Sequence, residues 1–173
     1  CGYFTLRGKP LNSYSAAQSK FTENAELSEL YQVIKNESYQ YVVYATDQDL
    51  DGFHIRGLLT GFFLRYMPEM KERLGMLQTP VIAIKKGNKL VRWHYSLSDD
   101  IQVKSGETSK YMKGLGSFKA SDLVEVVQKD GLENMIDLIE FDDEEIIDDW
   151  LNDKKADIRK EYLTQNVFSI AQL

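Results

Sequence analysis

The sequence predicts an α/β protein with a mainly parallel sheet flanked by helices, an antiparallel hairpin insertion and a helical C-terminal tail. Segments of strand character alternate with segments of helical spacing along the chain. One run of aromatic and β-branched residues ends in an acidic turn, and an apolar helical pattern follows it at once. The 173 residues are 43% hydrophobic, which suffices for a single core. We expect one domain over 1–173, of which 130–173 is the tail.

The first half of the chain contains the clearest elements. Residues 1–14 carry Gly and Pro at short intervals, which predicts an irregular loop. Apolar residues at helical spacing after Thr22 predict a short amphipathic helix. Residues 39–46 read YQYVVYAT and predict a strand that is buried on both faces. From Gly52 to Pro68 the apolar spacing is helical again, so this region reads strand, acidic turn, helix.

The second half predicts a hairpin and further helices. Residues 81–84 and 90–95 have strand character, and a basic turn at 85–89 separates them. Four further elements follow in chain order: a glycine-punctuated loop over 110–116, a helix over about 121–128, an acidic helical stretch from Glu133 and a mixed-charge helix over 153–165.

The formal net charge of -6 is unevenly distributed along the chain. Residues 1–129 carry a net charge of +3, residues 130–153 carry -11, and residues 154–173 carry +2. The acidity is therefore local, and a DNA-facing surface is compatible with the first three quarters of the chain.

Composition also excludes several classes of protein. No apolar run reaches the roughly 20 residues of a membrane helix, and no basic-then-apolar leader opens the chain. The single cysteine, Cys1, excludes a disulfide framework and a cysteine-based zinc cluster. The two histidines, His54 and His94, do not supply a zinc site in its place.

The acidic turn is the strongest candidate site. Asp47, Asp49 and Asp51 lie at i, i+2 and i+4 where the predicted strand ends, and side chains two apart in an extended chain leave on the same side. Two carboxylates that lie close together repel each other by several kcal/mol, on the order of 4 kcal/mol near a protein surface, unless a cation lies between them. We therefore expect a divalent metal beyond the carboxyl end of this strand, where open α/β sheets bind their ligands.

The sequence suggests two other interpretations of this turn, and the residues argue against the first. The segment DQDLDG fits the first positions of a calcium-binding EF-hand loop, but the twelfth position is Leu58 and not the bidentate glutamate. A strand also precedes the turn where an EF-hand has a helix. The turn is alternatively an ordinary solvated run of aspartates, although a buried strand and an apolar helix bracket it.

Basic residues elsewhere in the chain complement the acidic turn. Mg²⁺ accepts one or two carboxylates and keeps positions for water and phosphate oxygens, which suits phosphodiester chemistry. Arg7 and Lys9 lie together in the opening loop, and Lys113 precedes Gly114 and Gly116, where bare backbone can approach a phosphate. Each feature is weak alone, and the combination is what points to DNA.

Four segments resemble, in the same order, the Toprim domain of type II DNA topoisomerases of the gyrase B and eukaryotic topoisomerase II families. They are FTLRGKPLN, YATDQDLDGFHIRGLLTGFF, KYMKGLG and KKADIRKEYLTQN. The resemblance covers nearly the whole chain and implies a Toprim-like fold. It implies that 1–173 is a partial Toprim domain, from which the first, glutamate-bearing strand is absent. It also implies ATP-dependent double-strand passage by the assembled enzyme, and a B-type subunit like that of bacterial and tailed-phage enzymes.

The resemblance implies roles for the residues of the acidic turn. Asp47 and Asp49 match the magnesium ligands of the family, and Asp51 matches a third acid that supports the site. His54 aligns with a family histidine, but a histidine after a turn is also a common helix-start hydrogen bonder. Arg56 either reaches phosphate or caps a solvated face, and both interpretations stay open.

The resemblance also implies DNA contacts. Lys9 and Asn12 match positions that touch DNA near the cleavage site, beside Arg7. Lys113, with Gly114 and Gly116, matches a loop that lines the same site.

Two expected catalytic groups are absent from the sequence. The family's general acid or base is a glutamate followed by glycine, and the chain contains no Glu-Gly. The family's nucleophile is a tyrosine that lies beside an arginine in the breakage domain. Arg65-Tyr66 is the only such dipeptide in the sequence, and its helical spacing is typical of core packing, so we do not expect Tyr66 to be the nucleophile.

We expect double-stranded DNA and two protein partners. One is an upstream fragment or subunit with the glutamate and the ATPase, and the other is a breakage subunit with the tyrosine. The isolated chain is predicted inactive, and the cytoplasm is the expected location.

A different class of function also stays open. A noncatalytic metal-binding or DNA-binding module that has kept the aspartate turn but lost the glutamate strand has the same motifs.

Overall fold

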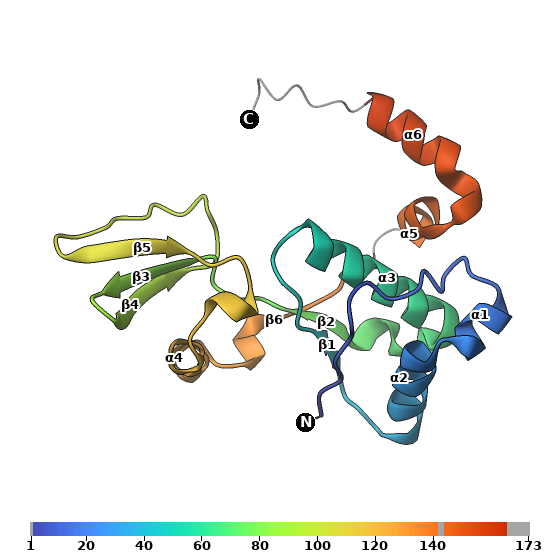
Figure 1. Cartoon of the computed structure of the whole chain (residues 1–173), viewed down its shortest axis with the longest axis horizontal. Helices are drawn as coiled ribbons and strands as arrows, with labels where there is room; N and C mark the ends of the chain where they lie inside the picture. Colours follow the sequence, from blue (N-terminus) through green and yellow to red (C-terminus); the bar gives the residue numbers. More distant parts are fainter. Residues whose placement is uncertain (1, 142–143, 166–173) are drawn as a thin grey trace. The chain divides into compact units, whose positions relative to one another are not determined.

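The computed structural model describes residues 2–141 and 144–165 (Figure 1). Contacts divide the chain into two compact units. Unit 1 takes its described residues from 1–38, 57–71 and 140–173, and unit 2 comprises 39–56 and 72–139. Cys1 and part of the predicted C-terminal tail lie outside the described residues. Within the described part of the chain, no helix has the length and apolarity needed to cross a membrane.

Unit 2 contains a first sheet of three short strands. Its strand order is β1-β2-β6, with β1 at Val42–Tyr44, β2 at Leu74–Leu77 and β6 at Ile136–Leu138. Strand β1 pairs with β2 in parallel, and β2 pairs with β6 antiparallel. The predicted strand at 39–46 is thus confirmed but shorter, and only Tyr44 in it is fully buried.

A second sheet in unit 2 is wholly antiparallel. Its order is β4-β3-β5, with β3 at Ile82–Lys86, β4 at Lys89–His94 and β5 at Glu107–Tyr111. The predicted hairpin is confirmed as β3–β4, and Gly87 with a φ of 59° turns the chain between them. The prediction of a mainly parallel sheet is wrong, because three of the four strand pairings among the described residues are antiparallel.

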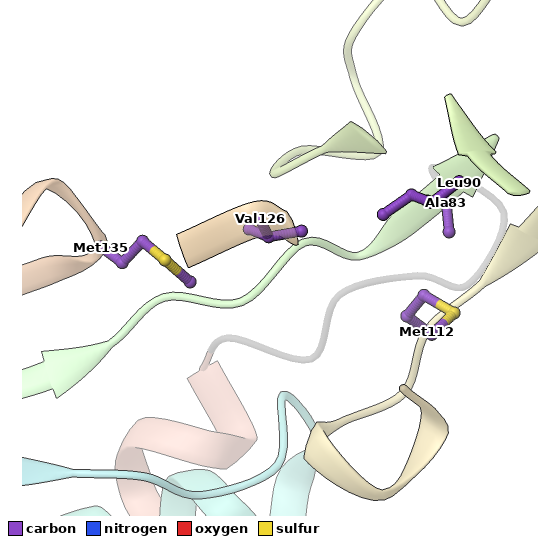
Figure 2. Packing of buried hydrophobic residues seen from close by; sticks show 5 residues of the cluster. All are labelled: Ala83, Leu90, Met112, Val126 and Met135. Carbon is purple, nitrogen blue, oxygen red and sulfur yellow. The ribbon is translucent and has the colours of Figure 1, made fainter. Parts of the chain in front are cut away.

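One hydrophobic cluster of unit 2 joins the second sheet to helix α4, Ala120–Asp130. Figure 2 shows its five buried members, which come from β3, β4, the segment after β5, α4 and a short 3-10 turn at Glu133–Met135. They are Ala83, Leu90, Met112, Val126 and Met135. Lys85, predicted in a basic turn, instead lies in β3 and forms an ion pair with Asp122 of α4.

Helix α3, Leu50–Tyr66, follows the acidic turn as predicted. Its residues 50–56 belong to unit 2, and its later residues belong to unit 1. It ends before Pro68, which lacks the backbone N–H needed to continue a helix. The fully buried Phe62 and Phe63 make its second half a core element of unit 1.

Unit 1 is helical. Helix α1, Gln18–Glu23, and helix α2, Ala25–Asn36, replace the single helix predicted after Thr22. Phe21 of α1 stacks on Tyr66 with ring centroids 4.1 Å apart. Helix α5, Glu144–Leu151, and helix α6, Ala156–Gln165, confirm the helical character of the later tail, with a 3-10 turn at Asp153–Lys155 before α6. Residues 136–138 were predicted helical and instead form β6, since they pair with β2.

Candidate functional site

The three aspartates of the acidic turn are exposed and follow β1 directly. Asp47 lies in the coil after the strand, Asp49 immediately precedes α3, and Asp51 lies in its first turn. The strand, turn and helix order predicted from the sequence is therefore the order that presents these carboxylates.

Asp49 caps the N-terminus of α3. Its Oδ1 accepts a hydrogen bond from the Gly52 backbone N–H at 2.9 Å, and its carbonyl accepts one from Phe53 N–H at 2.9 Å. Gly52 is buried, and a Cβ atom there would lie 2.9 Å from the Asp47 carbonyl carbon. The glycine after the third aspartate is therefore a packing requirement of this turn.

Asp47 reaches the glycine-punctuated loop that lies far along the chain. Its Oδ1 accepts a hydrogen bond from the Leu115 backbone N–H at 3.2 Å. The backbone N–H of Gln48 donates to the Lys113 carbonyl at 3.2 Å. Gly114 is buried between these contacts, where a Cβ atom would lie 2.8 Å from the Asp47 Cβ. The structure thus brings together the two motifs that the sequence assigned to one site.

The other two predicted residues of this loop lie at the surface. Lys113 and Gly116 are both exposed. Nothing lies within 4 Å of a Cβ atom built on Gly116. Only the first glycine of the loop is therefore required by close packing.

The burial of Arg56 contradicts both roles that the sequence analysis considered for it, contact with phosphate and capping of a solvated face. Arg56 is only 6% exposed, so it neither caps a solvated face nor reaches outward to a phosphate. Its guanidinium donates to Thr46 Oγ1 at 2.6 Å, to the Asp47 carbonyl at 3.4 Å and to the Met76 sulfur at 3.7 Å. It also lies over the Phe53 ring, 5.0 Å from the centroid. Burial lowers the pKa of this arginine.

The expected convergence of three carboxylates is not found. Among residues 2–141 and 144–165, no group of three or more His, Cys, Asp or Glu side chains is arranged to hold a metal ion. The donor chemistry still suits Mg²⁺, which takes hard carboxylate oxygens and commonly uses one or two of them. Asp47 and Asp49 each contribute one exposed carboxylate at this turn.

The predicted DNA-binding residues of the opening loop belong to unit 1. Arg7 and Lys9 are exposed, and the Arg7 backbone N–H donates to Glu26 Oε1 at 2.8 Å. Asn12 is engaged within the protein, since its Nδ2 donates to the Leu151 carbonyl at 2.7 Å. Its Oδ1 is buried with no hydrogen-bond partner among the described residues. Arg7 and Lys9 are thus the accessible members of this set.

Three further residues singled out in the sequence lie in α3. His54 is exposed in its first turns. Tyr66 is packed against Phe21, as predicted from its helical spacing. Arg65 anchors the opening loop, because its Nη1 donates at 2.7 Å to three carbonyls, those of Ser13, Tyr14 and Ala16.

Sequence reasoning missed two contributors to the site. One is the Leu115 backbone N–H, which carries no side-chain signal. The other is the pairing of Arg56 with Thr46. An arginine inside an apolar helical pattern is the signal that indicates such a buried role for Arg56.

Comparison with known proteins finds relatives of the chain. The chain is 32% identical to DNA topoisomerase 2 of Arabidopsis thaliana over 191 residues, which covers 96% of the chain. It is 33% identical to the B-type subunit of DNA topoisomerase 4 of Borreliella burgdorferi over 131 residues, which covers 69% of the chain. The chain is homologous to type II DNA topoisomerases. No protein-family model matches it.

The homology to type II DNA topoisomerases is regional. The chain spans 13% of the Arabidopsis topoisomerase and 22% of the Borreliella protein. A match to DNA topoisomerase 2 of Candida glabrata, 31% identical over 95% of the chain, also spans 13% of that relative. These eukaryotic topoisomerases fit poorly with the bacterial or phage origin expected from the sequence.

A solved type II topoisomerase structure has the same fold. The chain superposes on the DNA-binding, cleavage and re-ligation domain of Plasmodium falciparum topoisomerase II with a TM-score of 0.75, over 94% of this chain and 25% of that one. At 23% identity, this likeness supports a shared α/β fold and no more.

Proposed function

We propose that this chain is the region of a type II DNA topoisomerase that holds magnesium at the DNA cleavage site. The observation that carries the proposal is the hydrogen bond from Leu115 N–H to the Asp47 carboxylate. It joins the aspartate turn and the KGLG loop (residues 113–116), the two motifs that resemble the cleavage site of the family, in a single site of unit 2.

The residues of this site have distinct tasks in the proposal. Asp47 and Asp49 are the ligands for Mg²⁺, and Asp51 supports them through its charge. The bound ion would offset negative charge on the scissile phosphate. Asp49 also caps α3, which fixes the direction of its carboxylate. Lys113 is exposed beside this site and is proposed to contact phosphate.

The remaining parts of the enzyme are proposed to come from outside these 173 residues. Exposed Arg7 and Lys9 bind the backbone of double-stranded DNA. A glutamate-bearing fragment or subunit with the ATPase supplies the general acid or base. A tyrosine-bearing breakage subunit supplies the nucleophile. The chain alone is therefore proposed to be inactive, and the assembled enzyme performs ATP-dependent double-strand passage.

A second candidate is a noncatalytic metal-binding or DNA-binding module. The absence of a three-carboxylate group among the described residues favours it. The second candidate binds metal or DNA without cleaving it, and only the first requires Asp49 for chemistry.

The testing experiment compares Asp49→Asn with Asp137→Asn in the enzyme that contains this chain. The carboxamide introduced by Asp49→Asn still caps α3, so folding is retained, but a neutral ligand holds Mg²⁺ poorly. We expect Asp49→Asn to lose most Mg²⁺-dependent DNA cleavage and Asp51→Asn to lose less. Asp137 is an exposed carboxylate of β6, and its variant should cleave like wild type. Full cleavage by Asp49→Asn would exclude the proposed function.

A further inference from the structure

We propose that Arg56 is a positioning residue that clamps the end of β1 and so fixes the direction of the Asp47 carboxylate. The inference rests on the proposed function, since it assigns a task toward the same site. The sequence predicted that the Arg56 side chain contacts DNA or lies at the surface. In the structure it is buried and contacts Thr46 and Asp47 at the start of the turn.

The contacts of Arg56 converge on two consecutive residues. Nε donates to Thr46 Oγ1 at 2.6 Å. Nη2 lies 3.5 Å from the Thr46 carbonyl and 3.4 Å from the Asp47 carbonyl. The guanidinium fork thus spans the side chain of Thr46 and the peptide groups on both sides of Asp47.

All of these partners are neutral, so none of them supplies a counter-charge that offsets the free-energy cost of burying the guanidinium. A contribution to stability alone therefore does not explain this arrangement. Removing a guanidinium from water is unfavourable unless a counter-charge compensates it. Arg56 contacts a hydroxyl, two carbonyls, a thioether and an aromatic face. Only a planar, multidentate donor makes all of these contacts at once, so lysine cannot replace it. The geometry therefore points to a role in holding the turn.

The clamp contacts the backbone of Asp47, whereas the KGLG loop contacts its carboxylate. The Asp47 carbonyl accepts from Arg56, and its carboxylate accepts from Leu115 N–H. The neighbouring Gln48 N–H donates to the Lys113 carbonyl. Loss of the clamp leaves the backbone of Asp47 free to rotate, which moves its carboxylate away from the loop.

Charge and geometry predict opposite results, which allows a decisive test. Removal of a nearby positive charge alone would strengthen cation binding by the carboxylates. Loss of positioning would weaken it, and lost support of a metal ligand typically costs about tenfold or more in metal affinity.

The experiment uses Arg56→Lys, which keeps the charge, Arg56→Met, which removes it, and Thr46→Val, which removes only the hydroxyl acceptor. Arg92→Lys is the matched control, because Arg92 pairs with Glu107 on the second sheet. Two readouts are taken. The first is the Mg²⁺ concentration for half-maximal DNA cleavage by the enzyme that contains this chain. The second is amide hydrogen exchange of Leu115 and Gln48 in the same enzyme.

We expect Arg56→Lys and Thr46→Val to raise the half-maximal Mg²⁺ concentration about tenfold and to leave cleavage at saturating Mg²⁺ nearly unchanged. The Leu115 amide should exchange faster in both variants, because its acceptor carboxylate is no longer held in place, and Arg92→Lys should match wild type. Wild-type behaviour of Arg56→Lys and Thr46→Val would overturn the clamp, as would tighter Mg²⁺ use by Arg56→Met. If Arg56→Met does not fold, the other two variants decide the result.

Failure of the proposed function is distinguishable from failure of the clamp. If Asp49→Asn cleaves normally, the metal assignment fails, and exchange of the Leu115 amide still tests whether Arg56 holds Asp47. If Asp49→Asn is inactive and the exchange rates are unchanged in Arg56→Lys and Thr46→Val, the clamp alone is refuted.

Discussion

Gly114 packs directly against Asp47, so that a Cβ atom on this glycine would lie 2.8 Å from the Asp47 Cβ and would overlap its carboxylate. The two residues come from motifs that are 67 positions apart in the chain. The neighbouring Leu115 N–H donates to the same carboxylate. The loop therefore approaches the aspartate closely only because position 114 has no side chain.

Gly114→Ala should displace either the loop or Asp47. Overpacking at a well-packed site typically costs about 1–3 kcal/mol, so we expect a loss of that order in the free energy of unfolding. We also expect a large loss of Mg²⁺-dependent cleavage, since the Asp47 carboxylate cannot keep its position. Urea denaturation and a cleavage assay measure the two effects.

Gly116→Ala is the matched control in the same loop. A Cβ atom there meets nothing within 4 Å, so stability should change by no more than about 0.5 kcal/mol. Equal effects of the two alanines would show that close packing of Gly114 does not matter.

Asp49→Ala should destabilise the chain, whereas Asp49→Asn should not. The Asp49 Oδ1 accepts from Gly52 N–H at the start of α3, and loss of such a cap costs about 1 kcal/mol. Asparagine keeps an oxygen acceptor and caps as well as aspartate. Thermal melting of both variants checks this, and identical melting temperatures would argue against the cap.

Acid should destabilise the second sheet through Glu107. Its carboxylate receives two hydrogen bonds from Arg92, at 2.9 and 2.7 Å, and one from Lys104 N–H at 2.9 Å. Arg92, and then the Lys104 amide, lower the pKa of Glu107 from 4.5 to about 2. Because the folded pKa is depressed, this stabilisation is fully present above pH 4.5 and is lost as the pH falls towards 2. The free energy of unfolding is measured by denaturation at several pH values from about 6 down to about 2, a range that brackets the ordinary pKa of a carboxyl group.

Glu107→Gln tests the origin of that acid sensitivity. The variant lacks the titrating group, so the part of the acid loss that comes from Glu107 should disappear. Wild-type pH dependence in the variant would assign the loss to other carboxylates.

Lys9→Ala should weaken DNA binding with little dependence on sequence. Lys9 is exposed in the opening loop of unit 1, and loss of one phosphate contact makes the salt dependence shallower by about one unit. Binding titrations at several salt concentrations measure the slope. Lys20→Ala, at an exposed position of helix α1, is the control that should keep the wild-type slope. A loss confined to one DNA sequence would contradict a phosphate contact.

Local patterns in the sequence determined the elements that depend on neighbouring residues. The strand at Val42–Tyr44, the acidic turn and α3 were predicted in order, because a buried strand and an amphipathic or apolar helix differ in period. The β3–β4 hairpin was predicted for the same reason, with a glycine in its turn. The four topoisomerase-like segments were also legible without a structure, since each is short and contiguous.

Only the tertiary structure decided which strands pair and where Arg56 lies. Strands β2, β5 and β6 are short or polar, and their antiparallel partners lie elsewhere in the chain. The spacing of apolar residues within each segment therefore does not predict these strands or their pairing. The helical pattern showed that Arg56 belongs to α3, but its burial depends on Thr46 and Met76. The contact of Asp47 with Leu115 uses a backbone N–H, a group that every residue except proline possesses. Such contacts follow from how distant segments pack together, which the spacing of residues along one segment does not encode.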